Sequence, residues 1–178
     1  MTGSRFKPYP ETKDSAIEWL GRIPAHWSVT QIGRTGALSK GNGGTKADES
    51  VEGIPCVRYG DLYTRHRYFI SDTRARISAD RLASYTPILH GDVLFAGSGE
   101  TLDEIGKSAV NLLAEPACCG GDVILFRPAV RVNAEFLGLA ADSPQAVYQK
   151  HLMGRGVTVM HIYGDALKYL ILPIPPFE

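Results

Sequence analysis

The chain has 178 residues, of which 44% are hydrophobic and 21% are charged. That length is enough for one domain with its own core, and the composition excludes a disordered chain and a coiled coil. Lysine plus arginine equals aspartate plus glutamate at 19 each, so the bulk charge does not indicate a nucleic-acid partner. The three cysteines form no C-x-x-C pair and no zinc-binding spacing, which favours a reducing, cytoplasmic location. The first ten residues lack the apolar core of a signal peptide, and no stretch approaches a membrane span.

The charges are unevenly distributed along the chain. Residues 58–81 hold six arginines and three aspartates, whereas Lys107 is the only base between Asp92 and Asp122. This distribution predicts a fold with one basic and one acidic face.

The first 27 residues are expected to form an arm that packs on the body of the domain. Pro8 and Pro10 favour an extended opening, and Ser15 to Glu18 has capping-box spacing, which predicts a short helix or turn as far as Leu20. The side chains expected to hold the arm against the body are Trp19, Leu20, Ile23 and Trp27.

Strands and one helix are expected between residues 37 and 126. A weak strand over 37–40 runs into a glycine-rich loop at 41–46, and two further strands are expected over 54–59 and 68–70. A capped helix over 78–83 ends before Pro87. The strand 92–96 is expected to pair with 107–112 across a glycine-rich turn, and the apolar run 123–126 is the clearest strand.

Helices dominate the part of the chain that follows. Asn133 is expected to cap a helix over 134–141, and Ser143 with Pro144 predicts a second helix as far as Met153. A β-prone run then covers 157–162, and the segment 167–174 closes the domain. Runs of strands with few helices predict an α+β fold: a single domain with a mixed, mostly antiparallel twisted sheet flanked by a few short helices.

Residue spacing argues against catalysis. The ending Pro-Pro-Phe resembles part of a DNA adenine methylase loop, but the preceding Ile174 has no oxygen to accept a hydrogen bond from a target amino group. The glycine-rich loop lacks P-loop spacing. Cys119 could act as a nucleophile with His151 or His161 as base, but a cysteine beside an apolar strand favours core packing. We therefore expect no catalytic residue, no cofactor and no metal.

Polar and aromatic side chains follow several predicted strands, where a rigid sheet can present binding loops. Recognition of a DNA sequence needs bidentate donors and acceptors for the bases and phosphate contacts that hold the register. The candidates for base contacts are Asn42, Arg58, Asp61, Arg65, Arg67, Glu100, Gln149 and Arg155. The candidates for phosphate contacts are Lys40, Thr45, Lys46, Tyr59, Tyr63, Ser98, Thr101, Lys150 and Thr158.

The same positions also allow purely structural interpretations. The glycine-rich loop is typical of a solvated turn, Asp61 is typical of a turn cap, and the glycines around Arg155 also end a helix. Tyr59 and Tyr63 are alternatively core aromatics. The arginines expected to be surface or ion-paired residues are Arg74, Arg76 and Arg81.

Several motifs occur together along the chain. They are Asp14–Gly21 with Ile23–Trp27, Ile54–Tyr63, Gly91–Phe95, Cys118–Val123 and Leu170–Pro176. In this combination the chain resembles, over nearly its whole length, the target recognition domain of the specificity (S) subunit in Type I restriction–modification systems. The Trp-Leu-Gly and Ile-Pro opening combined with the final Pro-Pro is the most specific part of the resemblance.

The resemblance implies a non-catalytic domain over 1–178 that recognises one half of a bipartite double-stranded DNA site and directs methylation (M) and restriction (R) subunits. In that family, long spacer helices join two recognition domains and dock the methylation subunits. The chain stops at Glu178, where the first spacer helix would begin, so we expect a shortened chain, a half-subunit or a stand-alone domain. Two alternatives stay open: the recognition domain of a single-chain restriction–methylation enzyme, and a cysteine-dependent enzyme.

Overall fold

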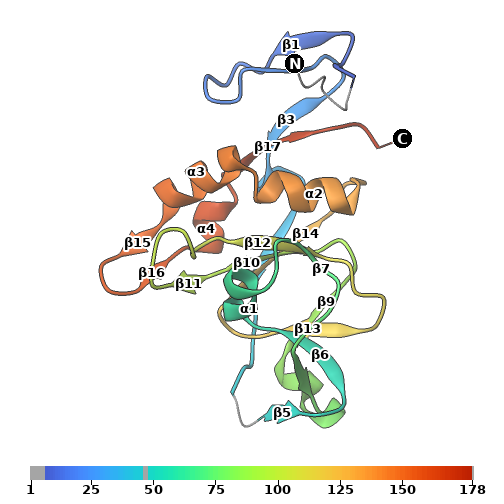
Figure 1. Ribbon diagram of the computed structural model, residues 1–178, viewed down its shortest axis with the longest axis vertical. Coiled ribbons are helices and arrows are strands. Elements are labelled where there is room, and N and C mark those ends of the chain that lie inside the picture. Colours follow the sequence, from blue (N-terminus) through green and yellow to red (C-terminus); the bar gives the residue numbers. More distant parts are fainter. Residues whose placement is uncertain (1–6, 46–47, 178) are drawn as a thin grey trace, which may run out of the picture.

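Two five-stranded sheets form the centre of the computed structural model, which describes residues 7–45 and 48–177 (Figure 1). The first sheet has the order β4 (Gly36–Lys40), β14 (Val123–Pro128), β10 (Val93–Ala96), β12 (Ser108–Asn111), β7 (Tyr68–Ile70). The second has the order β5 (Glu49–Ser50), β8 (Ala75–Ile77), β6 (Ile54–Val57), β13 (Ala117–Cys119), β9 (Thr86–Ile88). The helices are α1 (Tyr59–Thr64), α2 (Ala134–Ala141), α3 (Pro144–Met153) and α4 (Gly164–Leu167), with 3-10 turns at Ile32–Arg34 and Ala79–Ser84.

Three smaller sheets complete the described part of the chain. β1 (Thr12–Asp14) pairs with β2 (Arg22–Pro24), and β3 (Ser28–Gln31) pairs with β17 (Ile171–Ile174). A three-stranded sheet has the order β11 (Ser98–Gly99), β16 (Met160–His161), β15 (Arg155–Gly156).

The first sheet is buried on both faces because its central strands are apolar at successive positions. Side chains alternate between the faces of a strand. Val93 and Phe95 of β10 therefore lie in a core covered by α2 and α3, whereas Leu94 and Ala96 lie in a core shared with α1 and the second sheet. The two cores make a three-layer arrangement of helices, first sheet and second sheet, which Figure 1 shows from top to bottom.

The predicted fold class is confirmed. The strand pairs are mostly antiparallel, and the exceptions among the described residues are β7 with β12 and β6 with β13. The predicted pairing of 92–96 with 107–112 is also confirmed, with Leu94 opposite Ala109. The strands divide among several sheets, however, whereas the sequence patterns predicted one.

Helices α2 and α3 begin as their caps predict. The Asn133 side chain accepts a hydrogen bond from the Phe136 N–H at 2.7 Å. The Ser143 hydroxyl accepts one from the Ala146 N–H at 3.3 Å, with Pro144 in the first turn. Side-chain oxygens thus satisfy N–H groups that have no partner inside the helix.

One predicted boundary is wrong, because the strand expected over 54–59 ends at Val57 and Tyr59 begins α1. The Asp61 carboxylate accepts a hydrogen bond from the Arg58 N–H at 3.3 Å, which confirms Asp61 as a capping residue. The segment 15–20 is a turn between β1 and β2, and residues 79–84 form a 3-10 helix.

The N-terminal segment contacts the body through one tryptophan. Trp27 packs edge-on against Phe136 of α2, with ring centroids 5.1 Å apart, and Tyr9 packs against the same tryptophan. Ile23 is buried, and Trp19 keeps 36% of its surface exposed. The β1–β2 hairpin lies at the top of Figure 1, beyond the β3–β17 pair.

Candidate nucleic-acid interface

The small three-stranded sheet brings together two groups of candidate residues that are far apart in the sequence. Ser98 of β11 lies opposite His161 of β16, which in turn lies opposite Arg155 of β15. Glu100 and Thr101 directly follow β11, and Thr158 lies in the turn between β15 and β16. Five candidates therefore belong to this sheet and its loops: Ser98, Glu100, Thr101, Arg155 and Thr158.

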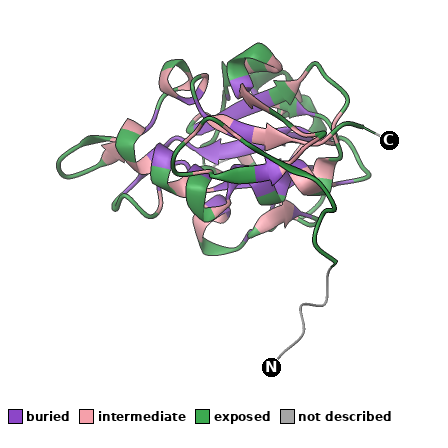
Figure 2. Ribbon diagram, turned by 90° about the horizontal axis from the view of Figure 1, so that it is seen from above, coloured by how far each residue is buried: buried purple, intermediate pink, exposed green. Residues whose placement is uncertain are grey.

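The β15–β16 hairpin projects from the body, and Figure 2 shows its turn as exposed. Val157 at the turn is 98% exposed. Gly156 has φ +137°, a region that favours glycine, and a Cβ there would lie 2.1 Å from the Val159 carbonyl oxygen. The glycine therefore sets the tight turn that exposes Arg155 and Thr158 to solvent.

A groove of about 660 Å³ lies beside this sheet, between β4 and the segment 161–168. Lys40 and Ser98, both candidates, line it. Three further lining residues were not among the predicted DNA contacts: His161, Tyr163 and Lys168. The His161 Nδ1 lies 3.0 Å from the Ser98 hydroxyl oxygen, so hydrogen-bonding groups from β11 and β16 meet at the groove wall.

A repeated motif could have indicated the wall of this groove. The tripeptide Tyr-Gly-Asp occurs at 59–61 and again at 163–165, and each copy lies at the start of a short helix, α1 or α4. The first copy was a candidate site and the second was overlooked. Strand-to-helix junctions of this kind present polar side chains at the surface.

Helix α1 places a second group of candidates near the loop that follows β11. The Tyr59 and Tyr63 rings are 6.1 Å apart, and Tyr59 is 37% exposed. Burial raises the pKa of Tyr63, and the charges of Glu104 and Glu100 add to this effect. Those carboxylates therefore lie within electrostatic range of α1. Tyr59 therefore lies at the surface, whereas Tyr63 is partly buried and packs against the core shared with the second sheet.

The loop before β5 reaches the start of α1 through the Arg58 side chain. The Arg58 guanidinium lies 2.9 Å from the Glu49 carboxylate and donates to the Thr45 carbonyl at 3.3 Å. The Asn42 N–H donates to the Thr86 hydroxyl at 2.9 Å, while residue 42 stays exposed. Lys46 lies outside the described residues. These contacts hold the loop against β9 and α1.

Gln149 and Lys150 are corrections to the predicted site, because both side chains are buried. Gln149 exchanges two hydrogen bonds of 2.9 Å with the backbone of Ile171, and Lys150 is 1% exposed. Neither can contact DNA in this fold. The spacing of Ala146, Gln149 and Lys150 is that of one helix face, and that face packs on the core.

The arginines between residues 58 and 81 do not form an unbroken basic face. Arg65 pairs with Asp72, Arg76 with Glu115 at 3.0 Å, and Arg81 with Asp48 at 3.1 Å. The expected ion pairing of Arg76 and Arg81 is thus confirmed. Arg67 stacks over the Tyr68 ring at 5.0 Å.

Arg155 differs from Arg65, Arg76 and Arg81, because no carboxylate lies within 4.0 Å of its guanidinium in the described ranges 7–45 and 48–177. The Glu104 carboxylate near this sheet is already engaged, because it accepts hydrogen bonds from the backbone N–H groups of Glu100 and Thr101. The positive charge available at this sheet therefore comes from Arg155, with Lys40 in the adjoining groove. Lys168 in that groove pairs with Asp165 at 3.4 Å, and Asp122 also lines it.

The cysteine-dependent alternative fails on burial. Cys56, Cys118 and Cys119 are each 0% exposed and lie in the second sheet. Burial raises the pKa of Cys119 to about 12, and a contact with Cys56 raises the pKa of Cys118. The same contact lowers the pKa of Cys56, but this thiol is fully buried. A nucleophilic cysteine needs an accessible thiolate and a lowered pKa. The proposed bases His151 and His161 contact Asp103 and Ser98 instead.

Among residues 7–45 and 48–177, no group of three or more His, Cys, Asp or Glu side chains could hold a metal ion. A helix that is long and apolar enough to cross a bilayer is likewise not found in that part of the chain.

Solved S subunits share this fold. The chain matches the Type I restriction–modification S subunit from M. genitalium at 15% identity and TM-score 0.53, over 83% of this chain and 34% of that one. It matches the HsdS subunit from Thermoanaerobacter tengcongensis at 18% identity and TM-score 0.53, over 86% and 34%. A chain from a structural study of complex assembly and conformational transition of the type I R-M system matches at 19% identity and TM-score 0.57, over 87% and 35%.

These matches confirm, at the level of the fold, the resemblance that the sequence motifs indicated. The chain spans about a third of the length of those structures. No family model and no curated relative matches its sequence.

Proposed function

We propose that this chain is a target recognition domain of a Type I S subunit, which binds one half of a bipartite duplex DNA site. In this proposal the chain is not catalytic, and separate methylation and restriction subunits perform the reactions. A cytoplasmic location belongs to the proposal, and the three unbridged thiols support it.

The observation that carries the proposal is the small sheet of β11, β16 and β15. It joins candidates from residues 98–101 with candidates from 155–158, beside a groove that also holds Lys40. A projecting hairpin of this kind fits a DNA groove, because a two-stranded β-ribbon can enter the major groove. The fold shared with S subunits supports the same role.

The roles within the interface follow from chemistry and exposure. Arg155, at the projecting hairpin and without a carboxylate partner among the described residues, is suited to a bidentate contact with a guanine. Lys40 in the groove is suited to a phosphate contact. Asn42, Tyr59 and Tyr63 extend the proposed surface toward α1.

A binding experiment can identify the bound DNA sequence and test this function at the same time. Selection from a randomised duplex library, followed by anisotropy titration of the enriched duplex, should give an affinity that falls roughly tenfold or more between about 50 and 200 mM salt. No enrichment, or binding insensitive to salt, would contradict the proposal.

Two substitutions separate base contacts from phosphate contacts. Arg155→Ala should weaken the binding free energy for the enriched duplex by about 1–3 kcal/mol and relax discrimination at one base pair. Lys40→Ala should weaken binding to all duplexes alike. It should also reduce the slope of log affinity against log salt concentration by about one. Lys13→Ala, an exposed lysine on β1, is the matched control and should leave binding unchanged.

A further inference from the structure

Strand β16 and the residues after it turn alternate side chains toward the core and toward the groove. Met160 packs against the core covered by α2 and α3, and Ile162 is 1% exposed in the same core. His161 instead lines the groove, and Tyr163 is 57% exposed. Because side chains alternate along an extended chain, His161 and Tyr163 share the outer face. Their rings stack with centroids 6.2 Å apart.

The register of the small sheet places two more polar residues on that face. Ser98 of β11 and Arg155 of β15 both lie directly opposite His161, one on each side of β16 (Figure 1). Directly opposite residues of antiparallel strands project to the same face of a sheet. The His161 imidazole therefore lies between a hydroxyl group and a guanidinium group.

One nitrogen of the His161 ring is engaged by the protein, and the other reaches solvent. Nδ1 lies 3.0 Å from the Ser98 hydroxyl oxygen. Within residues 7–45 and 48–177, no group forms a hydrogen bond with Nε2. The buried polar side-chain atoms left without a partner in those ranges belong to Arg58, His66 and Thr73, so the Nε2 atom of His161 is not buried. It is available to a ligand in the groove.

The charged side chains that line the groove balance one another. They are Lys40, Lys168, Asp122 and Asp165. Lys168 pairs with Asp165 at 3.4 Å, whereas Lys40 and Asp122 form no ion pair within the described ranges. An anion in the groove can therefore pair with Lys40. It also needs a hydrogen-bond donor, because the Asp122 carboxylate opposes it.

His161 can supply that donor in one of its two neutral forms. A phosphodiester oxygen accepts hydrogen bonds and donates none, so it requires the tautomer in which Nε2 carries the proton. Nδ1 is then an acceptor, and the Ser98 hydroxyl donates to it. The hydroxyl thus holds both the orientation and the tautomer of the ring.

We propose that His161 and Lys40 form a phosphodiester subsite for the DNA backbone, in which Ser98 is a positioning residue. The subsite rests on the proposed function, because its anion is a phosphate of the bound duplex. Its location favours the backbone over the bases. His161 is short and half-buried at the foot of the hairpin, whereas the exposed and longer Arg155 reaches further from the opposite position. Phosphates flank the groove that a β-ribbon enters.

Heteronuclear NMR of the imidazole nitrogens tests the positioning role without DNA. In the wild type at about pH 8, where a neutral imidazole is favoured, His161 should be found in the tautomer with the proton on Nε2. Ser98→Ala should give a mixture of both tautomers, and Ser98→Thr, which keeps the hydroxyl, should restore the single form. A wild-type ring with its proton on Nδ1 would overturn the proposal.

Anisotropy titrations at the same pH distinguish a neutral donor from a charge and from a base contact. His161→Ala should weaken the enriched duplex and an unselected duplex by the same factor, roughly tenfold. The slope of log affinity against log salt concentration should stay unchanged, whereas Lys40→Ala lowers it by about one. His90→Ala, an exposed histidine between β9 and β10, is the matched control and should bind as the wild type does. A loss confined to one base pair, or a slope lowered by His161→Ala, would contradict the subsite.

A scan of the enriched duplex with neutral methylphosphonate linkages locates the contact, because each linkage removes a charged acceptor oxygen from the backbone. In the wild type, one such linkage should weaken binding roughly tenfold, and this loss should disappear in His161→Ala. Ser98→Ala should reduce the loss at the same linkage, and Ser98→Thr should retain it. A scan in which no linkage depends on His161 would overturn the subsite. An undiminished loss in Ser98→Ala would overturn the positioning role.

A more conservative variant keeps the test decisive if His161→Ala does not fold. In His161→Asn the side-chain amide lies near the former Nδ1 position and can still accept from Ser98, but no atom replaces Nε2. His161→Asn should therefore show the same uniform loss of affinity and the same missing linkage effect.

The outcomes separate the two proposals. If an unselected duplex shows the loss that depends on His161 but no sequence is enriched, the subsite stands and the proposed recognition of a DNA site fails. If a sequence is enriched and binds the wild type and His161→Asn equally, the subsite fails and the proposed function stands. If no duplex binds, both fail.

Discussion

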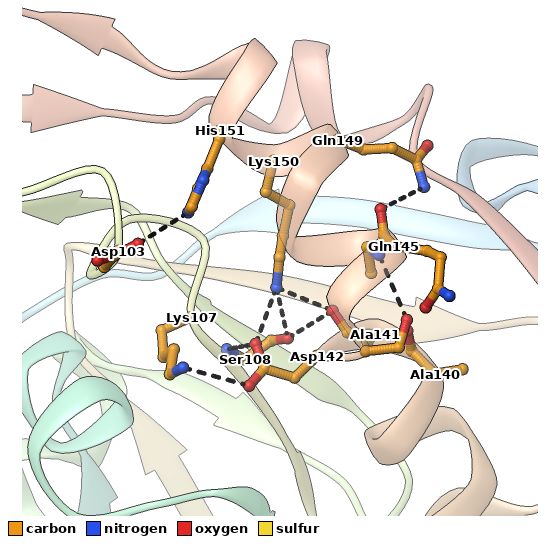
Figure 3. Close-up of polar contacts among 12 residues, drawn as sticks. Asp103, Lys107, Ser108, Ala140, Ala141, Asp142, Gln145, Gln149, Lys150 and His151 are labelled. Atoms are coloured by element: carbon orange, nitrogen blue, oxygen red, sulfur yellow. Dashed lines mark hydrogen bonds and ion pairs between the residues drawn. The ribbon is translucent and has the colours of Figure 1, made fainter. Parts of the chain in front are cut away.

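The helix-covered face of the first sheet and the small β11–β16–β15 sheet are built in opposite ways. On the first, Phe95 and Phe126 are almost completely buried, and the buried Lys150 ammonium pairs with the Asp142 carboxylate at 3.1 Å (Figure 3). On the second, each strand has two residues, and the turn at Val157 is exposed. The difference shows how an exposed hairpin can keep a defined position. Its support lies in the packed layer behind it rather than in its own short strands.

The largest effect is expected from a large side chain in that packed layer. Phe95→Ala removes a ring that is 1% exposed and should lower the free energy of unfolding by about 3–5 kcal/mol. Urea unfolding followed by circular dichroism measures this change. Leu139→Ala on α2, where the side chain is 46% exposed, is the control and should stay within about 0.5 kcal/mol. Equal losses in both variants would contradict the layer assignment.

An intermediate effect is expected at a buried carboxylate on the first sheet. Asp92 is 1% exposed, pairs with Arg127 at 2.7 Å and accepts from the Leu89 N–H at 2.7 Å. Asp92→Ala should lower the free energy of unfolding by about 2–3 kcal/mol, because it removes charged hydrogen bonds and leaves the Leu89 N–H without its acceptor. Thermal unfolding at neutral pH measures this cost. A loss no larger than that of an exposed pair would show that solvent replaces the carboxylate.

The smallest effect is expected at an exposed ion pair on the second sheet. Arg76 and Glu115 are 3.0 Å apart, with side chains 35% and 52% exposed. A double-mutant cycle of Arg76→Ala and Glu115→Ala should give a coupling of about 0.2–1 kcal/mol. The coupling should shrink in high salt, since screening weakens surface pairs. A coupling energy larger than the loss of stability measured for Asp92→Ala would contradict the contrast between buried and exposed pairs.

Local sequence signals predicted the elements of this fold well where the local chemistry decides the structure. Asn133 and Ser143 begin their helices because side-chain capping needs only neighbouring backbone. The strand over 123–126 formed because a continuous apolar run is stable when it is buried on both faces.

The site was predicted less completely. Ser98 and Arg155 were selected one by one, but their common sheet arises from β16 between them. This strand lies in the predicted β-prone run 157–162, but the sequence did not indicate with which segments it pairs. Lys150 was misassigned because a lysine on a helix is usually exposed. Its burial depends on acceptors from β12 and α2, which lie 42 and 8 residues away in the sequence.

The amino-acid sequence by itself determined the α+β class, the helix caps, the buried strands and the motifs that resemble those of S subunits. Only the tertiary structure decided which polar residues reach solvent, which carboxylate pairs with which cation, and which loops share a groove. The physical reason is the range of the interactions. Capping and apolar patterning act between neighbours, whereas exposure and ion pairing depend on segments that meet only after the chain has folded.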